Sequence, residues 1–95
     1  MRLVWSASAL ADLERFAAFL QDHHPNLAKR IAPEIIKRAR MIADYPEVGR
    51  LVEHAGAYRE LSMSVLNATY VLRYSIRSDH VRLLRVFHGR EHRAP

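Results

Sequence analysis

The sequence predicts an α+β domain in which a helical hairpin packs on one face of a mainly antiparallel sheet. Two observations lead to this fold class. In the first half of the chain, apolar residues recur every three or four positions, which is typical of amphipathic helices. In the last third, short blocks alternate apolar with basic side chains, as a strand does when one face meets a core and the other meets water. The predicted order is β-α-α-β-β-β, and 95 residues fit a single domain spanning 1–95.

The chain opens with a short apolar run, Leu3-Val4-Trp5, which fits a brief first strand. A helix is predicted from Ala7 to Asp22, and either Ser6 or Ser8 can cap it, because a serine oxygen accepts from the free amide groups of the first turn. Pro25 ends this helix, because the residue before a proline avoids helical angles. The apolar stripe consists of Leu10, Leu13, Phe16, Ala17 and Leu20, with Asp12, Glu14, Arg15 and Gln21 between them.

Pro25 also opens the second predicted helix, because a proline at the first helical position loses no hydrogen bond. Pro33 lies inside the helical pattern, where a proline costs about 3 kcal/mol, so we expect a kink or a later helix start there. Tyr45-Pro46 ends the element, Pro46 to Arg50 fits a turn, and Leu51 to Ala57 is predicted to be loop. The apolar stripe of this helix is Ala28, Ile31, Ile35, Ala39 and Ile42.

Three strands are predicted after the loop: Tyr58-Arg59-Glu60-Leu61, Tyr70 to Tyr74, and Val81 to Arg90, the last two joined by a turn at Ser78-Asp79-His80. Guanidinium groups on their open face would suit bidentate contacts to phosphate or carboxylate, so this surface is expected to meet an anionic partner. A solvated surface that only confers solubility would give the same pattern. The outward arginines are expected to be Arg59, Arg73, Arg77, Arg82 and Arg90, and the aromatic Trp5, Tyr70 and Tyr74 are interpreted as core residues.

The composition narrows the functional classes. Fifteen Lys and Arg against ten Asp and Glu give a net charge of +5, so acidic partners are expected. There is no cysteine, which excludes disulfides, thiolate catalysis and cysteine-bound zinc. No apolar signal core or membrane-length run is present, so we expect a cytoplasmic location without membrane contact. His88 and His92 are four residues apart, but on a strand end and a tail this spacing brings no rings together, so neither a metal nor a cofactor is expected.

Five segments carry a further signal along nearly the whole chain: Val4-Trp5-Ser6 with Ala9, Asp12 and Leu13 behind it, Pro46-Glu47-Val48-Gly49-Arg50, Tyr58-Arg59-Glu60-Leu61, Tyr70-Val71-Leu72-Arg73-Tyr74, and Leu84-Arg85-Val86-Phe87-His88-Gly89-Arg90. In this order and spacing they resemble the toxins of the RelE/ParE superfamily from bacterial type II toxin–antitoxin systems. The resemblance implies the small β-α-α-β-β-β domain of that superfamily.

The resemblance leaves two activities open, because a fold alone does not decide function. RelE-like members cut mRNA in the ribosomal A site, and ParE-like members poison DNA gyrase. RNA cleavage needs an activated 2′-hydroxyl, stabilised charge on the phosphate and a protonated leaving oxygen. RelE-like enzymes supply these with lysines or a glutamate in mid-chain, arginines on the third and fourth strands, and a terminal tyrosine or histidine.

Compared position by position, this chain keeps only part of the RelE-like set. Val71 stands where the third-strand arginine is expected, although Arg73 would reach the same face and substitute for it. Arg90 stands where the fourth-strand arginine falls. The loop Leu51 to Ala57 holds no lysine, and the chain stops at Pro95 without a late tyrosine.

The ending Val86-Phe87-His88-Gly89-Arg90 is similar to that of ParE-like members, so the sequence favours a toxin that poisons DNA gyrase rather than an enzyme. The alternative is a RelE-like, ribosome-dependent mRNA endoribonuclease. His88 would suit acid–base chemistry, but a partly buried histidine at a strand end explains it equally. For a nuclease the candidate catalytic residues are Arg59, Arg73, His88 and Arg90; for a gyrase poison the candidate target-binding residues are Arg73, Arg82, His88, Arg90 and Arg93.

The resemblance also implies partners. A cognate antitoxin is expected, ParD-like with a ribbon-helix-helix DNA-binding part, in a toxin–antitoxin hetero-oligomer. The target would be DNA gyrase or the ribosome with its mRNA. A third reading, a family member that is no longer toxic but still binds its antitoxin, stays open.

Overall fold

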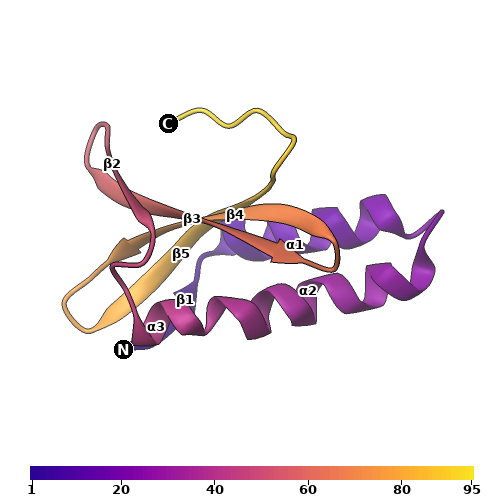
Figure 1. Cartoon of the computed structure of the whole chain (residues 1–95), viewed down its shortest axis with the longest axis horizontal. Coiled ribbons are helices and arrows are strands. Elements are labelled where there is room, and N and C mark those ends of the chain that lie inside the picture. The colour runs from indigo at the N-terminus through magenta and orange to yellow at the C-terminus, as the bar shows by residue number, and fades with distance from the viewer.

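The computed structural model describes residues 1–95 and contains both predicted layers, with the helices on one side of a single sheet (Figure 1). The elements are β1 (Arg2–Trp5), α1 (Ala7–Leu20), α2 (Pro25–Ala39), α3 (Met41–Asp44), β2 (Arg50–Glu53), β3 (Ala57–Val65), β4 (Ala68–Ile76) and β5 (His80–His88). The sheet has the strand order β1-β5-β4-β3-β2, with β1 parallel to β5 and the other pairs antiparallel. The predicted fold class is therefore confirmed. No helix is both long and apolar enough to cross a membrane.

Helix α1 begins where a serine was expected to cap it. The Ser6 hydroxyl accepts from the Ala9 amide at 3.0 Å and donates to the Leu84 carbonyl at 2.9 Å. One side chain thus satisfies a free amide of the first turn and ties the start of the helix to β5. The helix ends at Leu20, two residues before the predicted end at Asp22.

Helix α2 begins at Pro25 and runs through Pro33 to Ala39. The expectation of a later start near Pro33 is therefore wrong. Pro33 is exposed, and its missing N–H leaves the carbonyl of Lys29 without the usual helical donor. Burial of the apolar stripe on α1 and on the sheet holds the helix together despite this lost hydrogen bond.

The prediction of a loop from Leu51 to Ala57 is wrong in its first half. Arg50–Glu53 forms β2, which pairs antiparallel with the start of β3. Only His54 to Gly56 forms the turn, in which Ala55 has φ 50° and Gly56 has φ 117°. Three of the four β2 side chains are exposed, so the strand has no alternating pattern and is defined by its partner rather than by its own sequence.

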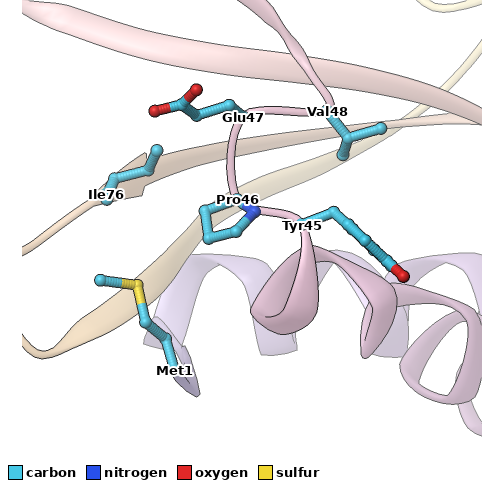
Figure 2. Close-up of a pocket in the computed structure, with 6 residues that line it drawn as sticks. All are labelled: Met1, Tyr45, Pro46, Glu47, Val48 and Ile76. Carbon is cyan, nitrogen blue, oxygen red and sulfur yellow. The ribbon is translucent and has the colours of Figure 1, made fainter.

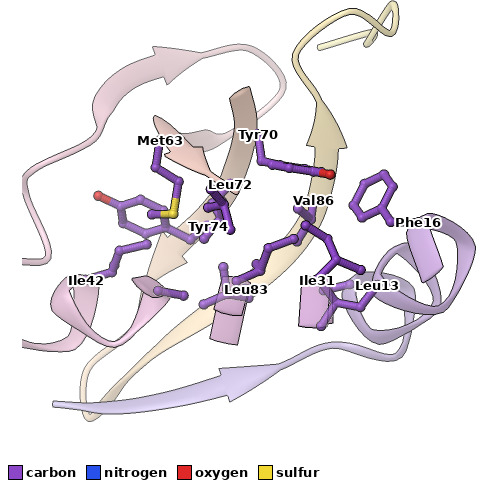
Figure 3. Close-up of a cluster of buried hydrophobic side chains, with 14 of the residues drawn as sticks. Leu13, Phe16, Ile31, Ile42, Met63, Tyr70, Leu72, Tyr74, Leu83 and Val86 are labelled. Carbon is purple, nitrogen blue, oxygen red and sulfur yellow. The ribbon is translucent and has the colours of Figure 1, made fainter. Parts of the chain in front are cut away.

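The core lies between the helices and the sheet (Figure 3). Tyr70 and Tyr74 are buried in it and Trp5 packs against it, as predicted for these aromatics. The Tyr74 hydroxyl donates to the Pro46 carbonyl at 2.7 Å and accepts from the Gly49 amide at 2.8 Å. A Cβ on Gly49 would lie 2.7 Å from the same hydroxyl oxygen, so the close approach of this segment to β4 requires glycine.

Candidate functional site

The face of the sheet opposite the helices carries a row of charged residues. In register across the strands, Arg50 stands opposite Glu60, Glu60 opposite Arg73, and Arg73 opposite Arg85. Directly opposed residues share one face of a sheet, so these four form a row from β2 to β5. We call this surface the open face.

Glu60 is the centre of that row. It is only 8% exposed, and its carboxylate binds Arg73 Nε at 2.9 Å, Arg93 Nη2 at 3.1 Å and Arg50 Nη2 at 3.5 Å. Burial alone raises the pKa of Glu60, but the hydrogen bonds from Arg93 and Arg73 outweigh it and hold that pKa below its ordinary value. Glu60 is therefore ionised at neutral pH and neutralises part of the arginine charge.

The Arg73 guanidinium is surrounded by aromatic rings and hydrogen-bond acceptors. Its guanidinium carbon lies 4.5 Å from the ring centre of Tyr58 and 4.9 Å from that of Phe87, both within reach of a cation–π interaction. Its Nη2 also donates to the Ala94 carbonyl at 2.8 Å. The side chain is only 12% exposed. Arg73 lies on the expected face of the sheet, but its guanidinium is not free for a ligand.

The chain after β5 crosses the open face, on the side away from the helices (Figure 1). Arg93 reaches Glu60, and the Ala94 carbonyl reaches Arg73, so both ends of the Glu60–Arg73 pair hold this tail. A hollow of about 360 Å³ remains between the tail and β2, β3 and β4. Its lining includes Tyr58 and His92. No sequence pattern predicts this contact, because the two acceptors lie more than twenty residues from their donors in the chain.

Arg59 lies on the other face of β3. It stands opposite Tyr74, which is fully buried among the helices, so Arg59 is on the helix side rather than on the open face as predicted. Its Nη1 donates to the Gly49 carbonyl at 2.8 Å and to the Glu47 carbonyl at 3.2 Å. This arginine fastens the segment before β2 to the sheet.

His88, at the end of β5, is partly buried and lies edge-on against Tyr70, with ring centres 5.3 Å apart. Because Tyr70 belongs to the core, His88 also lies on the helix side. Its Nδ1 accepts from the Arg90 amide at 3.1 Å, which places the ring proton on Nε2 in the neutral form. Arg90 itself is exposed and makes no ion pair.

Asp12, one of the polar residues that fall between the apolar positions of α1, is buried rather than exposed to solvent. It is 4% exposed, and its carboxylate accepts from the Val86 amide and from Arg85 Nε, each at 2.8 Å, and from Arg15 at 3.3 Å. Strand β1 pairs with β5 only up to Leu83, so Asp12 satisfies an edge amide that no strand covers. Burial raises the pKa of Asp12, and the bonds from Arg85 and Val86 more than offset this and lower it. The spacing of α1 does not distinguish Asp12 from the other polar residues between its apolar positions, so its burial could not be predicted from the sequence pattern.

A second hollow lies beside the segment 45–48, which precedes β2 (Figure 2). It has a volume of about 580 Å³ and is lined mainly by apolar side chains, with Met1 and Ile76 facing Pro46 across it. Tyr45 and Val48 complete the apolar wall, and both are exposed. With Glu47 as its only carboxylate and no histidine or lysine in its lining, this hollow is better suited to an apolar group than to acid–base chemistry.

The structure brings some of the predicted site residues together and separates others. Arg73 and Arg93 meet on Glu60, and His88 and Arg90 are joined through one hydrogen bond. Arg82 is on the open face at the far end of β5, exposed and unpaired, because the extra residue Leu84 bulges from the strand and keeps Arg82 and Arg85 on the same face. No group of three or more His, Asp or Glu side chains is arranged to hold a metal ion.

Comparison with known proteins places these observations in a family context. Residues 3–93 match the sequence family described as ParE toxin of type II toxin-antitoxin system, parDE. Toxin RelE2 of Caulobacter vibrioides is 34% identical over 88 residues, which cover 93% of this chain and 94% of the relative. Toxin RelE1 of the same organism is 30% identical over 88 residues, covering 93% and 92%.

Among solved structures, one described as the chromosomal ParDE TA system from P. aeruginosa is similar to this chain with a TM-score of 0.74. The match covers 93% of this chain and 95% of the other at 19% sequence identity. At this identity the likeness establishes the shared fold.

Proposed function

The chain belongs to the ParE toxin family of type II toxin–antitoxin systems, and we propose that it arrests growth by binding and poisoning DNA gyrase. One observation carries this choice over RNA cleavage: the four candidate catalytic residues do not point to a common position. Arg73 is on the open face, whereas Arg59 and His88 are on the helix side of the sheet. A nuclease needs its proton donors and its charge-stabilising groups within hydrogen-bond reach of one phosphate.

Distance within the helix-side face adds to this argument. Arg59 stands opposite Tyr74 and His88 opposite Tyr70, so their positions differ by four residues along β4. At about 3.3 Å per residue this is about 13 Å along the strand direction alone. Arg59 also donates to two carbonyls of the segment before β2, and that role is structural.

The target-binding residues that we propose are Arg73, Arg82, His88, Arg90 and Arg93. Arg82 and Arg90 are exposed and unpaired, so they can contact a protein target without breaking an internal interaction. Arg73 and Arg93 would act through the surface that they build with Glu60 and the tail. Such contacts supply binding energy and need no change of charge during a reaction, which distinguishes them from catalytic groups.

The alternative, mRNA cleavage on the ribosome, is favoured by the names of the two Caulobacter relatives, Toxin RelE2 and Toxin RelE1. In that case Arg59, Arg73, His88 and Arg90 would be the catalytic set. The tail would have to leave the open face for Arg73 to meet a phosphate, because the Ala94 carbonyl and Glu60 occupy its donors.

Two assays run side by side test the proposal. Purified protein is added to a gyrase supercoiling reaction, and mRNA from cells that express the protein is mapped by primer extension. Inhibited supercoiling or trapped DNA breaks, without codon-positioned mRNA cuts, is the expected result. Codon-positioned cuts with normal supercoiling would replace the proposal by the alternative. Normal growth on expression would point to a non-toxic protein that retains antitoxin binding.

As a type II toxin, the protein has an antitoxin as its partner, and we propose that this antitoxin is ParD-like, with a ribbon-helix-helix part and an acidic tail. The acidic tail of the antitoxin would fold on binding and lie along the helical hairpin and the sheet of the toxin. The net charge of +5 supports this, because opposite charge speeds association. Binding of an acidic tail peptide should weaken as salt rises. Affinity that is independent of salt would contradict the electrostatic part.

A further inference from the structure

Most arginines of the sheet are occupied by internal partners, so the free positive charge of the molecule lies elsewhere. Of the fifteen Lys and Arg, six form ion pairs and Arg59 is bound to carbonyls. Of the remaining eight, five lie on α2 and its C-cap, and the rest are Arg77, Arg82 and Arg90. The five on α2 are Lys29, Arg30, Lys37, Arg38 and Arg40, all of them exposed.

Helix α2 with its C-cap therefore holds nearly all of the net charge. Its five cations are opposed by a single acid, Glu34, which makes no ion pair, so the segment carries +4 of the chain's net +5. The helix C-terminus accounts for part of this, because a cation in the last turn is stabilised by the helix dipole. That reason applies to Lys37 and Arg38, but Lys29 and Arg30 lie about two turns earlier, beyond its reach.

Four of these cations share one side of the helix. At about 100° per residue, Lys29, Arg30, Lys37 and Arg40 fall within an arc of about 100° that is opposite the buried stripe of α2. We call these four residues the α2 stripe. Its length from Lys29 to Arg40 is about 16 Å, the span of about five base-pair steps of a duplex. In Figure 1 the outer side of α2 is on the margin of the molecule, away from the sheet.

The chemistry of the stripe fits a nucleic acid better than a protein. The centre of a protein interface is apolar and depleted of charge, whereas nucleic-acid interfaces are polar and strongly positive. None of the exposed large apolar side chains lies within α2; they belong to α1, to α3 and the segment after it, and to the sheet and the N-terminus. There is also no aromatic residue on α2 for stacking unpaired bases, which argues against a single strand.

We propose that the α2 stripe binds the phosphate backbone of duplex DNA, without sequence preference, by ion pairing from one rigid helix face. This inference does not depend on whether gyrase or the ribosome is the target. It gives the toxin its own DNA contact, separate from any that its antitoxin makes. The contact would hold the toxin near DNA, and its energy would come largely from released counterions.

The test compares two variants of equal net charge. The stripe variant carries Lys29→Gln, Arg30→Gln and Lys37→Gln, and the control variant carries Arg77→Gln, Arg82→Gln and Arg90→Gln. Each removes three exposed, unpaired cations. Binding of the purified chain to a short labelled DNA duplex is followed by fluorescence anisotropy between about 50 and 200 mM salt. Thermal melting verifies that both variants fold, and the double variant Lys29→Gln, Arg30→Gln serves if the triple variant does not.

The stripe variant should bind the duplex at least about tenfold more weakly than the parent protein. The magnitude of the slope of log K against log salt should fall by about 2 to 3, since each lost phosphate contact lowers that magnitude by about 0.9. The double variant should lower the slope by about 1 to 2. The control variant should keep its slope within about one contact of the parent protein.

Equal losses in the two variants would overturn the proposal, because they would show that net charge alone attracts DNA. Failure of the parent protein to bind the duplex would overturn it as well. Tighter binding to duplex RNA or to a single strand would contradict the choice of DNA. Loss of poly-glutamate binding by the stripe variant with unchanged duplex binding would assign the stripe to an acidic protein instead.

Discussion

Asp12 and Glu60, the two buried acids, show how single residues hold the sheet to its surroundings. Asp12 accepts a hydrogen bond from the Val86 amide, at an edge of β5 that no strand covers. Glu60 forms ion pairs with Arg50, Arg73 and Arg93 on the open face. Both oxygens of each carboxylate already bind donors within the protein, so neither carboxylate is free to bind a substrate. Their bonds link α1 and the tail to the sheet, so we interpret both acids as structural residues that shape the neighbouring surfaces.

Replacing Asp12 by alanine should lower the free energy of unfolding by about 2 to 3 kcal/mol, because it leaves the buried Val86 amide without an acceptor and Arg85 without its partner. Urea denaturation measures the change. Glu14→Ala, at an exposed position on the same helix, should stay within about 0.5 kcal/mol of the parent protein. Equal effects of the two substitutions would contradict the role given to Asp12.

Acid stability should depend on the same two residues. The pKa of Asp12 and the pKa of Glu60 are both lowered in the folded protein. Their contribution to the free energy of unfolding is therefore complete above the pKa values of the unfolded chain, at about pH 4 to 5. It is lost as the pH falls through the lower pKa values of the folded protein. Urea midpoints between about pH 6 and 2 should fall steeply for the parent protein and less for Asp12→Asn with Glu60→Gln.

The matched control for this pH series is Glu14→Gln with Glu34→Gln, which removes two carboxylates that make no ion pair. It should keep the steep acid loss of the parent protein. A profile as flat as that of the buried-acid variant would mean that carboxylates in general, rather than this buried pair, set the acid limit.

At the scale of elements, α2 tolerates a proline because its inner face is firmly packed. Pro33→Ala should restore a helical hydrogen bond and raise the free energy of unfolding by up to about 3 kcal/mol. Urea or thermal denaturation measures the gain. Pro25→Ala, at the first helical position, should give no such gain, because no hydrogen bond is lost there. An unchanged stability of Pro33→Ala would contradict an interior position for this residue.

The elements also show which parts of the molecule a sequence can predict. The amphipathic helices, the strands β1, β3, β4 and β5, and the buried Tyr70 and Tyr74 follow from periodicity, which reports one-sided burial. Strand β2 was missed, because most of its side chains are exposed and its existence depends on pairing with β3.

The interaction partners of the charged residues could not be predicted from periodicity. Glu60 and Arg93 are 33 positions apart, and Asp12 and Arg85 are 73 apart, so only strand register and the path of the tail bring them together. The expectation of a free arginine surface on the sheet failed for Arg59 and Arg73 for this reason. Arg77, Arg82 and Arg90 are exposed as predicted, but Arg77 and Arg90 lie just beyond the ends of β4 and β5 rather than within a strand.

For the whole molecule, the fold separates three surfaces. The open face is covered in part by the tail, the apolar hollow lies beside the segment before β2, and the α2 stripe is on the outer side of the helices. A toxin that acts by contact can use several surfaces at once, whereas an enzyme must concentrate its groups in one. Because the candidate catalytic residues are divided between the open face and the helix side of the sheet, we propose a gyrase poison rather than a nuclease.

The most direct measurement of that claim is the activity of His88→Ala, in growth arrest and in the gyrase supercoiling assay. The His88 ring contacts Tyr70 and the Arg90 amide and has no partner for proton transfer, so its loss should disturb local packing and remove only one of the five proposed target contacts. Removal of the chain from Val86 onward, which deletes part of the core strand together with Arg90 and Arg93, should abolish toxicity and serves as the positive control. We predict that folded His88→Ala keeps most of its toxicity. A folded His88→Ala that binds its target normally but loses about 10²–10⁴-fold in activity, as expected for a general acid or base, would contradict the account.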